Sequence, residues 1–251
     1  MIKTSLRIEV VTMHKYEKIA RYIIQHIEAH SLTMGDQLPS LDEIITQFGY
    51  SKSTVIKALA LLERAGIIYQ VQGSGIYVRG HNRDDYINLS ELKGFRSSMR
   101  HSQLTSKTIT CALEEPSDWV KGQLNLTNQE KIYHIVRVRY LDGRPFCVEE
   151  SHYSHTYVPY LDTKITNNFI FTYLSQNLNI NFSFADKFIR ICDLTSFEAE
   201  KLAVHPGEVG LVTEEKFYIS DGTPVVVSRI IYPRHESKFF IQTNNHYSLM
   251  D

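Results

Sequence analysis

The sequence has few cysteines and no long apolar run. Its three cysteines, Cys111, Cys147 and Cys192, stand far apart in a chain of 251 residues. A sparse, odd set of this kind favours free thiols in a reducing compartment over a disulfide framework. No stretch of about 18 apolar residues occurs, and the N-terminus lacks the sustained apolar core of a secretory signal. We therefore expect a cytoplasmic protein with no membrane-spanning helix.

Signatures of catalysis and of cofactor binding are also missing. The sequence contains neither the Ser, His and Asp order of a hydrolase nor a glycine-rich phosphate loop. His152 and His155 lie close in sequence to Glu149 and Glu150, but this spacing fits no common metal pattern. Histidines at a strand end and in a loop explain them better. We expect no catalytic residue, no cofactor and no metal site.

Neither charge dominates, because the formal net charge is −1. The charge is nevertheless unevenly placed, with a net of +2 over residues 1–80 and −3 over residues 81–251. The basic bias is clearest between residues 50 and 80, where four basic side chains stand against one acid. This bias is compatible with a phosphate-bearing partner, although a solvated helix face shows the same balance.

Two capped helices are predicted between residues 40 and 66. Ser40 and Glu43 form a capping box at the start of the first helix, and Gly49 ends it. Ser51 caps the second helix, and Gly66 closes it. Apolar side chains recur on one face of this second helix, at Val55, Leu59 and Leu62. The two helices are therefore expected to pack against a common core.

Two short strands, Ile67–Val71 and Ile76–Val78, are predicted directly after the second helix. A polar tip joins them, made of Gln72, Gly73, Ser74 and Gly75. Such a tip lets the backbone approach a phosphate or a groove closely. Two helices followed by this hairpin describe a winged helix-turn-helix, so we expect double-stranded DNA as a partner. The second helix would read DNA with polar residues near its start, namely Lys52, Ser53, Thr54 and Lys57.

Residues 35–78 resemble the GntR family of bacterial transcription factors. The resemblance is carried by the Leu-Pro-Ser of residues 38–40, by the recognition helix and by the glycine-rich wing. It implies DNA contacts from Ser40, from the recognition helix and from the wing. Two family arginines are replaced by Lys52 and Lys57, and a third by Asp42, which adds a negative charge near phosphate. Because only Arg presents a rigid fork to guanine, the usual family operator is not expected.

The DNA-binding domain is predicted to span residues 13–79. Its first helix carries Ile19, Ile23 and Ile27 on one face, and residues 1–12 match no family element, so we expect poor order there. A polar stretch marks a linker at 80–93. Residues 94–251 are then expected to form an effector-binding and dimerisation domain.

Beyond the linker the pattern is α+β. Asp142-Gly143 and Asp221-Gly222 signal two hairpins. Helices are predicted at Ser117–Leu124, Phe169–Asn177 and Ser196–Leu202. Strands are predicted at Ser106–Leu113, Ile132–Leu141, Pro145–His152, Phe184–Cys192, Val209–Ile219, Val225–Tyr232 and Phe239–Thr243.

This second half resembles the UTRA effector-binding domain of the HutC subfamily of GntR regulators, over roughly residues 94–244. The segment Arg137–Tyr153, a helix near 169–176, the run LAVHPGEVGL and a final hairpin carry the resemblance. It implies a chorismate-lyase-like fold, an antiparallel sheet with helices. The expected fold class is therefore α+β, with a winged helix-turn-helix joined by a linker to such a domain.

Two arginines on one predicted strand are the candidates for effector binding. Arg137 and Arg139 share a face, and their guanidiniums would suit a carboxylate or phosphate. Glu149, on the next strand, resembles a subfamily position that contacts polar groups of a ligand. A cross-strand ion-pair network on a sheet surface is the competing interpretation. Phe169 and Phe171 occupy positions where sugar-phosphate-binding relatives carry Ser and Tyr, which favours a more apolar or aromatic ligand.

We expect a ligand-responsive transcriptional regulator rather than an enzyme. The resemblance favours a homodimeric repressor, released from a palindromic operator by a small-molecule effector, either a sugar phosphate or another anionic metabolite. Three alternatives stay open. They are an activator of the same architecture, a chorismate-lyase-like enzyme fused to a DNA-binding domain, and an architectural DNA-binding protein without a ligand.

Overall fold

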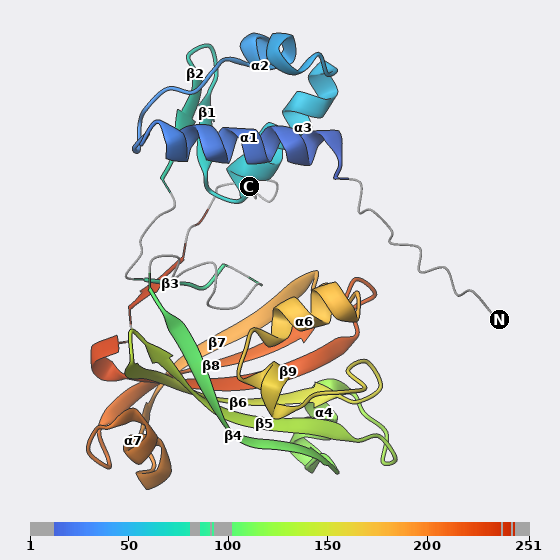
Figure 1. The fold of residues 1–251 in the computed structure, drawn as a ribbon, viewed down its shortest axis with the longest axis vertical. Helices are drawn as coiled ribbons and strands as arrows, with labels where there is room; N and C mark the ends of the chain where they lie inside the picture. The colour runs from blue at the N-terminus through green and yellow to red at the C-terminus, as the bar shows by residue number, and fades with distance from the viewer. Residues whose placement is uncertain are drawn as a thin grey trace, which may run out of the picture. The chain divides into compact units, whose positions relative to one another are not determined.

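The computed structural model describes residues 13–80, 86–90, 92, 102–236, 238–241 and 243. The chain divides into two compact units, residues 1–82 with 242–251, and residues 83–241 (Figure 1). The poor order predicted for residues 1–12 lies outside the described residues. Among the helices of the described ranges, none has the length and apolar character needed to cross a membrane.

Three helices form most of the first unit: α1 (Lys15–Ala29), α2 (Leu41–Phe48) and α3 (Lys52–Arg64). The predicted caps are confirmed, because the side chains of Ser40 and Ser51 accept from the amides of Glu43 and Thr54. Gly49 ends α2 in the left-handed conformation that glycine adopts without strain. The strands β1 (Ile68–Val71) and β2 (Gly75–Val78) follow α3 and pair antiparallel, as predicted.

One apolar core holds this unit together. Residues of α1, α3 and the hairpin meet in it, and the predicted stripes are buried, at Ile19, Ile23, Ile27, Val55, Leu59 and Leu62. Thr243 belongs to the same unit, and its carbonyl accepts a hydrogen bond of 2.8 Å from Arg79 Nη2.

A six-stranded antiparallel sheet dominates the second unit. Its strands are β4 (Leu104–Glu114), β5 (Ile132–Leu141), β6 (Arg144–Ser154), β7 (Phe184–Asp193), β8 (Val209–Tyr218) and β9 (Pro224–Pro233). They lie in the order β4-β5-β6-β9-β8-β7, so β4 and β7 are the edges of the described sheet. The predicted hairpins β5–β6 and β8–β9 are confirmed. Asp142 and Gly143 both have positive φ, as a two-residue turn of this kind requires.

Helices cover both faces of the sheet (Figure 1). On one face α5 (Thr163–Thr166) packs against β4, and α6 (Ile170–Asn177) closes an aromatic-rich core. On the other face α4 (Asp118–Leu124) packs against β9, and α7 (Ser196–Leu202) against β6. Side chains alternate between these two environments along each strand.

Three parts of the second unit differ from the predictions. The segment predicted as linker contains a strand, β3 (Ile87–Asn88), and Ile87 is buried. The predicted strand Phe239–Thr243 shortens to β10 (Phe239–Phe240), which pairs in parallel with β3. Neither α5 nor the short 3₁₀ helix η1 (Arg234–Glu236) was predicted. Two-residue strands and single helical turns are too short to produce a periodic pattern.

Candidate DNA-binding and effector sites

The start of α3 is an exposed cap of hydroxyl groups. Ser51 Oγ lies 3.1 Å from Ser53 Oγ and 2.9 Å from Thr54 Oγ1, and accepts from the Thr54 amide at 3.4 Å. Lys52 and Ser53 are exposed, and Thr54 is half-buried. The N-terminal end of a helix carries partial positive charge, which Lys52 reinforces. This end of α3 therefore suits a phosphate group.

Lys57 lies on α3 and is exposed. Its Nζ is 4.2 Å from the centroid of the Tyr16 ring on α1, within the range of a cation–π contact. Tyr16 therefore positions this lysine, a role for which the sequence gives no signal.

The wing tip is held by side chains at its base. Ser74 Oγ lies 2.6 Å from the Tyr77 hydroxyl, and Gln37 Nε2 donates to the Ser74 carbonyl at 3.4 Å. Gly75 has φ +141, and a Cβ placed there would lie 2.8 Å from Gln37 Nε2. The tip residues Gln72, Gly73 and Ser74 are exposed. The wing thus presents backbone and short polar groups outward, and Gln37 is a support that sequence reasoning missed.

Ser40 is exposed, but its hydroxyl already forms hydrogen bonds as the N-cap of α2. Its hydroxyl donates to Glu43 Oε2 at 2.8 Å, and its amide donates to the same oxygen at 2.7 Å. These bonds, the backbone one first, lower the pKa of the Glu43 carboxyl. A phosphate contact from Ser40 would compete with this carboxylate.

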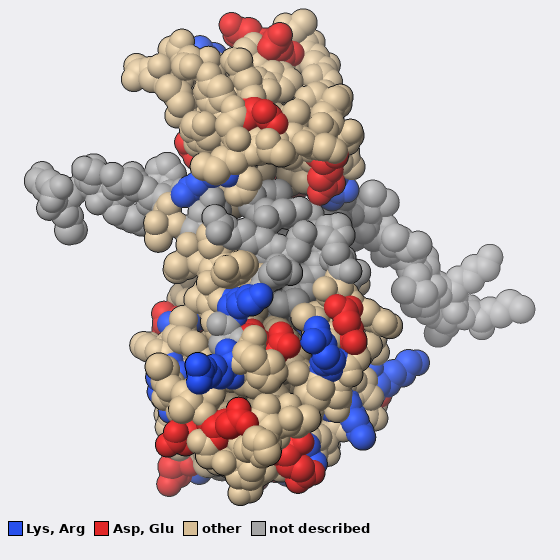
Figure 2. Space-filling view, turned by 90° about the vertical axis from the view of Figure 1, so that its left-hand side faces the viewer, with Lys and Arg blue, Asp and Glu red and all other residues tan. Residues whose placement is uncertain are grey.

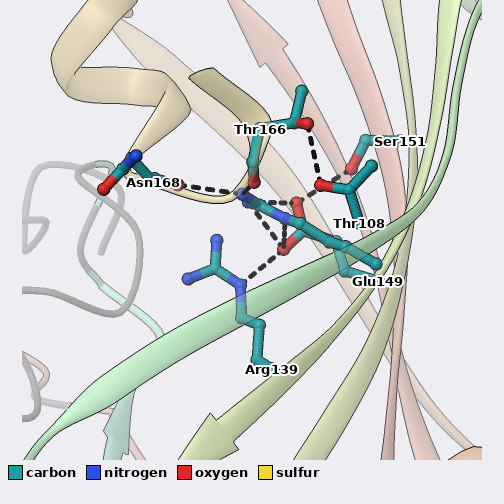
Figure 3. A network of polar contacts seen from close by, with 7 residues as sticks. Thr108, Arg139, Glu149, Ser151, Thr166 and Asn168 are labelled. Atoms are coloured by element: carbon teal, nitrogen blue, oxygen red, sulfur yellow. Dashed lines mark hydrogen bonds and ion pairs between the residues drawn. The ribbon is translucent and has the colours of Figure 1, made fainter. Parts of the chain in front are cut away.

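In the second unit Arg137, Arg139 and Glu149 meet beside the loop between α5 and α6. Figure 3 shows Arg139 and Glu149 together with Thr166 and Asn168. Arg137 Nη2 lies 2.8 Å from Glu149 Oε1, and Arg139 Nε lies 2.7 Å from Glu149 Oε2. All three are buried, with exposed fractions of 2%, 6% and 5%. The structure therefore brings together the predicted residues, but inside the fold and not on an exposed sheet surface.

All three nitrogens of the Arg137 guanidinium donate hydrogen bonds. Nε and Nη2 donate to Glu149, while Nη1 donates to the carbonyls of Thr166 and Asn168 at 2.9 and 3.1 Å. The guanidinium therefore ties the α5–α6 loop to the sheet. Sequence reasoning missed both carbonyl partners, because it missed α5.

The ionisation of Glu149 depends on its two partners. Burial opposes the charged form, but the guanidiniums of Arg137 and Arg139 outweigh it and lower the pKa of Glu149 to about 2. Glu215 lies on the same sheet face, 3.5 Å from Lys187 Nζ, and burial raises its pKa. The cluster therefore has three basic side chains, Arg137, Arg139 and Lys187, and two acidic ones, Glu149 and Glu215. Their formal net charge is +1.

The two candidate phenylalanines have different surroundings. Phe169 is the N-cap of α6 and lines an open hollow of about 510 Å³ with Lys164 and Tyr173. Phe171 packs with the rings of Phe182 and Phe217, each 4.9 Å away between centroids. Phe171 therefore serves the core, while Phe169 has a half-exposed position beside Asn168.

The histidines considered in the sequence do not group as their spacing suggested. His155 packs against the Tyr133 ring, with centroids 5.8 Å apart. Glu149 and Glu150 point to opposite faces of the sheet, as neighbours on a strand must. His152 instead stacks on His134 of β5, with centroids 4.7 Å apart.

Comparison with known proteins gives the same organisation. The family model described as "Bacterial regulatory proteins, gntR family" matches residues 15–78, and the one described as "UTRA domain" matches residues 99–237. The HTH-type transcriptional regulator YydK of Bacillus subtilis (strain 168) is 40% identical over 233 residues, which is 93% of this chain and 99% of YydK. Its crystal structure aligns with a TM-score of 0.82, covering 92% of this chain and 100% of that one.

Two further relatives are named as regulators. The mannosyl-D-glycerate transport/metabolism system repressor MngR of Escherichia coli (strain K12) is 31% identical, covering 64% of this chain and 67% of MngR. The regulator TreR of B. subtilis is 27% identical, covering 83% of this chain and 88% of TreR. These relatives are regulators and not enzymes. The chain therefore belongs to the GntR family, as a transcriptional regulator of the HutC type with a DNA-binding helix-turn-helix and a ligand-binding UTRA domain.

Proposed function

We propose that the chain is a homodimeric repressor in the cytoplasm, released from a palindromic operator when a small anionic metabolite binds. The observation that carries the proposal is the buried cluster of Arg137, Arg139 and Glu149. Buried guanidiniums of fixed geometry recognise carboxylate and phosphate groups well. On the face of the larger unit seen in Figure 2, by contrast, acidic and basic side chains are intermixed.

The α5–α6 loop is the element through which the ligand would act. An anion that engages Arg137 competes with the carbonyls of Thr166 and Asn168, which now hold that loop to the sheet. Loss of these bonds would let α6 move, and Phe169 at its N-cap would move with it. Ligand binding and loop position are thereby coupled, as a switch between two states requires.

Repression is the mode that the relatives support. MngR is named a repressor, and a structure of the TreR effector-binding domain is described as that of a trehalose repressor. The DNA contacts would come from Ser40, Lys52, Ser53, Thr54, Lys57 and the wing tip at residues 72–75.

Dimerisation is supported by the exposed edge strand β7. Phe188 and Ile191 are 65% and 73% exposed, although they lie on opposite faces of that strand. An unpaired apolar edge readily joins a second sheet edge. A twofold dimer would present two recognition helices to two related half-sites.

Selection from a random duplex library tests the DNA half of the proposal. The full chain should enrich an inverted repeat and bind it with two chains per duplex. The selected duplex then serves in a melting-temperature screen of anionic metabolites, where a ligand at about 100 times its Kd adds about 2.7 kcal/mol. Enrichment of one asymmetric half-site bound by a single chain would contradict the palindromic arrangement.

A further inference from the structure

Two histidines and two glutamates gather on the sheet face that carries α4 and α7. They come from three neighbouring strands, with Glu114 on β4, His134 on β5, and Glu150 and His152 on β6. His134 and His152 are direct cross-strand partners, and their rings stack with an interplanar angle of 9°. Strand register alone therefore fixes this group, on the face opposite the Arg137 cluster.

We propose that His134, Glu150 and His152 bind a divalent transition-metal ion, with Zn²⁺ as the representative ion. One donor atom from each residue lies within 4.8 Å of the other two. Ligand atoms around a tetrahedral Zn²⁺ stand about 3.3 Å apart, so small side-chain rotations complete the set. Two imidazoles and one carboxylate are a donor set that such ions favour.

A second carboxylate orients the first histidine. Glu114 Oε1 lies 3.1 Å from His134 Nδ1, on the side of the ring away from Glu150, which lies 3.0 Å from Nε2. Histidines that bind metals usually donate their other ring N–H to a carboxylate in this manner. Glu114 therefore has the place of an orienting partner, and Nε2 faces the ion.

Charge and access are compatible with a cation at this position. The His134 and Glu150 side chains are 21% and 39% exposed, so an ion reaches them from solvent and a water molecule can supply a further ligand. Arg229 is the register partner of Glu150, but it is bound by Glu198 at 2.7 Å, which offsets its charge. Bound metal would join β5 to β6 and stabilise the second unit.

The test is a Zn²⁺ titration of the full, untagged chain after treatment with a chelator. Calorimetry should show one tight site per chain, and the melting temperature should rise with the ion. Glu114→Gln should weaken binding by about 10-fold, as expected for an orienting partner. His134→Gln and His152→Gln each remove a direct ligand and should weaken binding more than Glu114→Gln does. Co²⁺ in place of Zn²⁺ should give the visible absorption of a four-coordinate site, lost in the same variants.

The double variant His26→Gln with His30→Gln is the matched control. These histidines form a second pair of close rings at the C-terminal end of α1, with centroids 4.2 Å apart, and supply two donors. The proposal requires that this variant keep the tight site. It is overturned if the wild-type chain binds no ion, if His134→Gln and His152→Gln bind normally, or if the α1 variant loses the site. Should a sheet variant fail to fold, the test is made by ¹⁵N NMR spectra of the imidazoles in the variant His26→Gln with His30→Gln. The proposal requires that Zn²⁺ shift the ring signals of two histidines in those spectra.

Discussion

At the scale of single residues, Arg137 connects three segments of the second unit. One guanidinium reaches a carboxylate on the neighbouring strand and two carbonyls of the α5–α6 loop. Removing either side of a buried ion pair leaves an uncompensated charge, which costs more than the pair itself contributes. Glu149 is consequently a structural residue as well as a candidate for effector binding.

We predict that Glu149→Gln lowers the free energy of unfolding of the second unit by about 3–5 kcal/mol at pH 7. The exposed Glu200→Gln on α7 is the control and should change it little. The folded pKa of Glu149 is depressed to about 2, so its contribution is present above the unfolded value of about 4.5 and is lost as pH falls toward 2. Denaturant unfolding at several pH values should therefore show the wild type and the variant converging in acid. A constant difference across that range would contradict the charge assignment.

At the scale of elements, α3 and the wing should carry DNA binding together. Lys52→Ala and Lys57→Ala should each weaken operator binding. If the lysine contacts a base, its loss should cost about 1–3 kcal/mol of binding free energy at that base pair. If it contacts a phosphate, the slope of log K against log salt concentration should fall by about one in magnitude. Arg64→Ala, in the last turn of α3, is the matched control and should bind normally. Unchanged binding in both lysine variants at moderate salt would show that α3 does not face DNA.

The edge strand β7 gives a second prediction at this scale. Phe188→Asp with Ile191→Asp should convert the dimer to a monomer, because charged side chains oppose pairing of strand edges. Ile109→Asp, at a 42% exposed position on the other edge strand, β4, should remain dimeric. Sedimentation at micromolar concentration distinguishes these outcomes. A wild-type chain that is strictly monomeric, with and without DNA, would refute the dimer.

The elements that the sequence predicts well are those with strong local signals. Ser40 and Ser51 each cap a helix as predicted, and the predicted strand Ile132–Leu141 has the same first and last residues as β5. The shared face of Arg137 and Arg139 also follows from alternation. The carbonyl partners of Arg137 and the pairing of His134 with His152 depend on which distant segments meet. Spacing along one sequence carries no such information.

At the scale of the whole molecule, one unit has the features of a DNA reader and the other those of a ligand sensor. Net charge follows this division, since the basic bias lies in the first 80 residues. The proposed repressor requires that a ligand event in the second unit change the affinity of the first unit for DNA. Such coupling is reciprocal, so operator DNA should weaken ligand binding by the same factor.

The central claim is tested most directly by fluorescence anisotropy of the selected operator, with and without the anion that most stabilises the chain. Arg139→Gln is the informative variant, because it keeps the ion pair between Arg137 and Glu149. Alanine at both arginines would instead leave the Glu149 carboxylate buried without a cation. Without the anion, the wild type and Arg139→Gln should bind the operator with similar Kd. With the anion, the wild type should lose affinity by about 10-fold or more, a coupling of about 1.4 kcal/mol, and the variant should not respond. A variant that is released as readily as the wild type would place the anion site elsewhere and contradict the account.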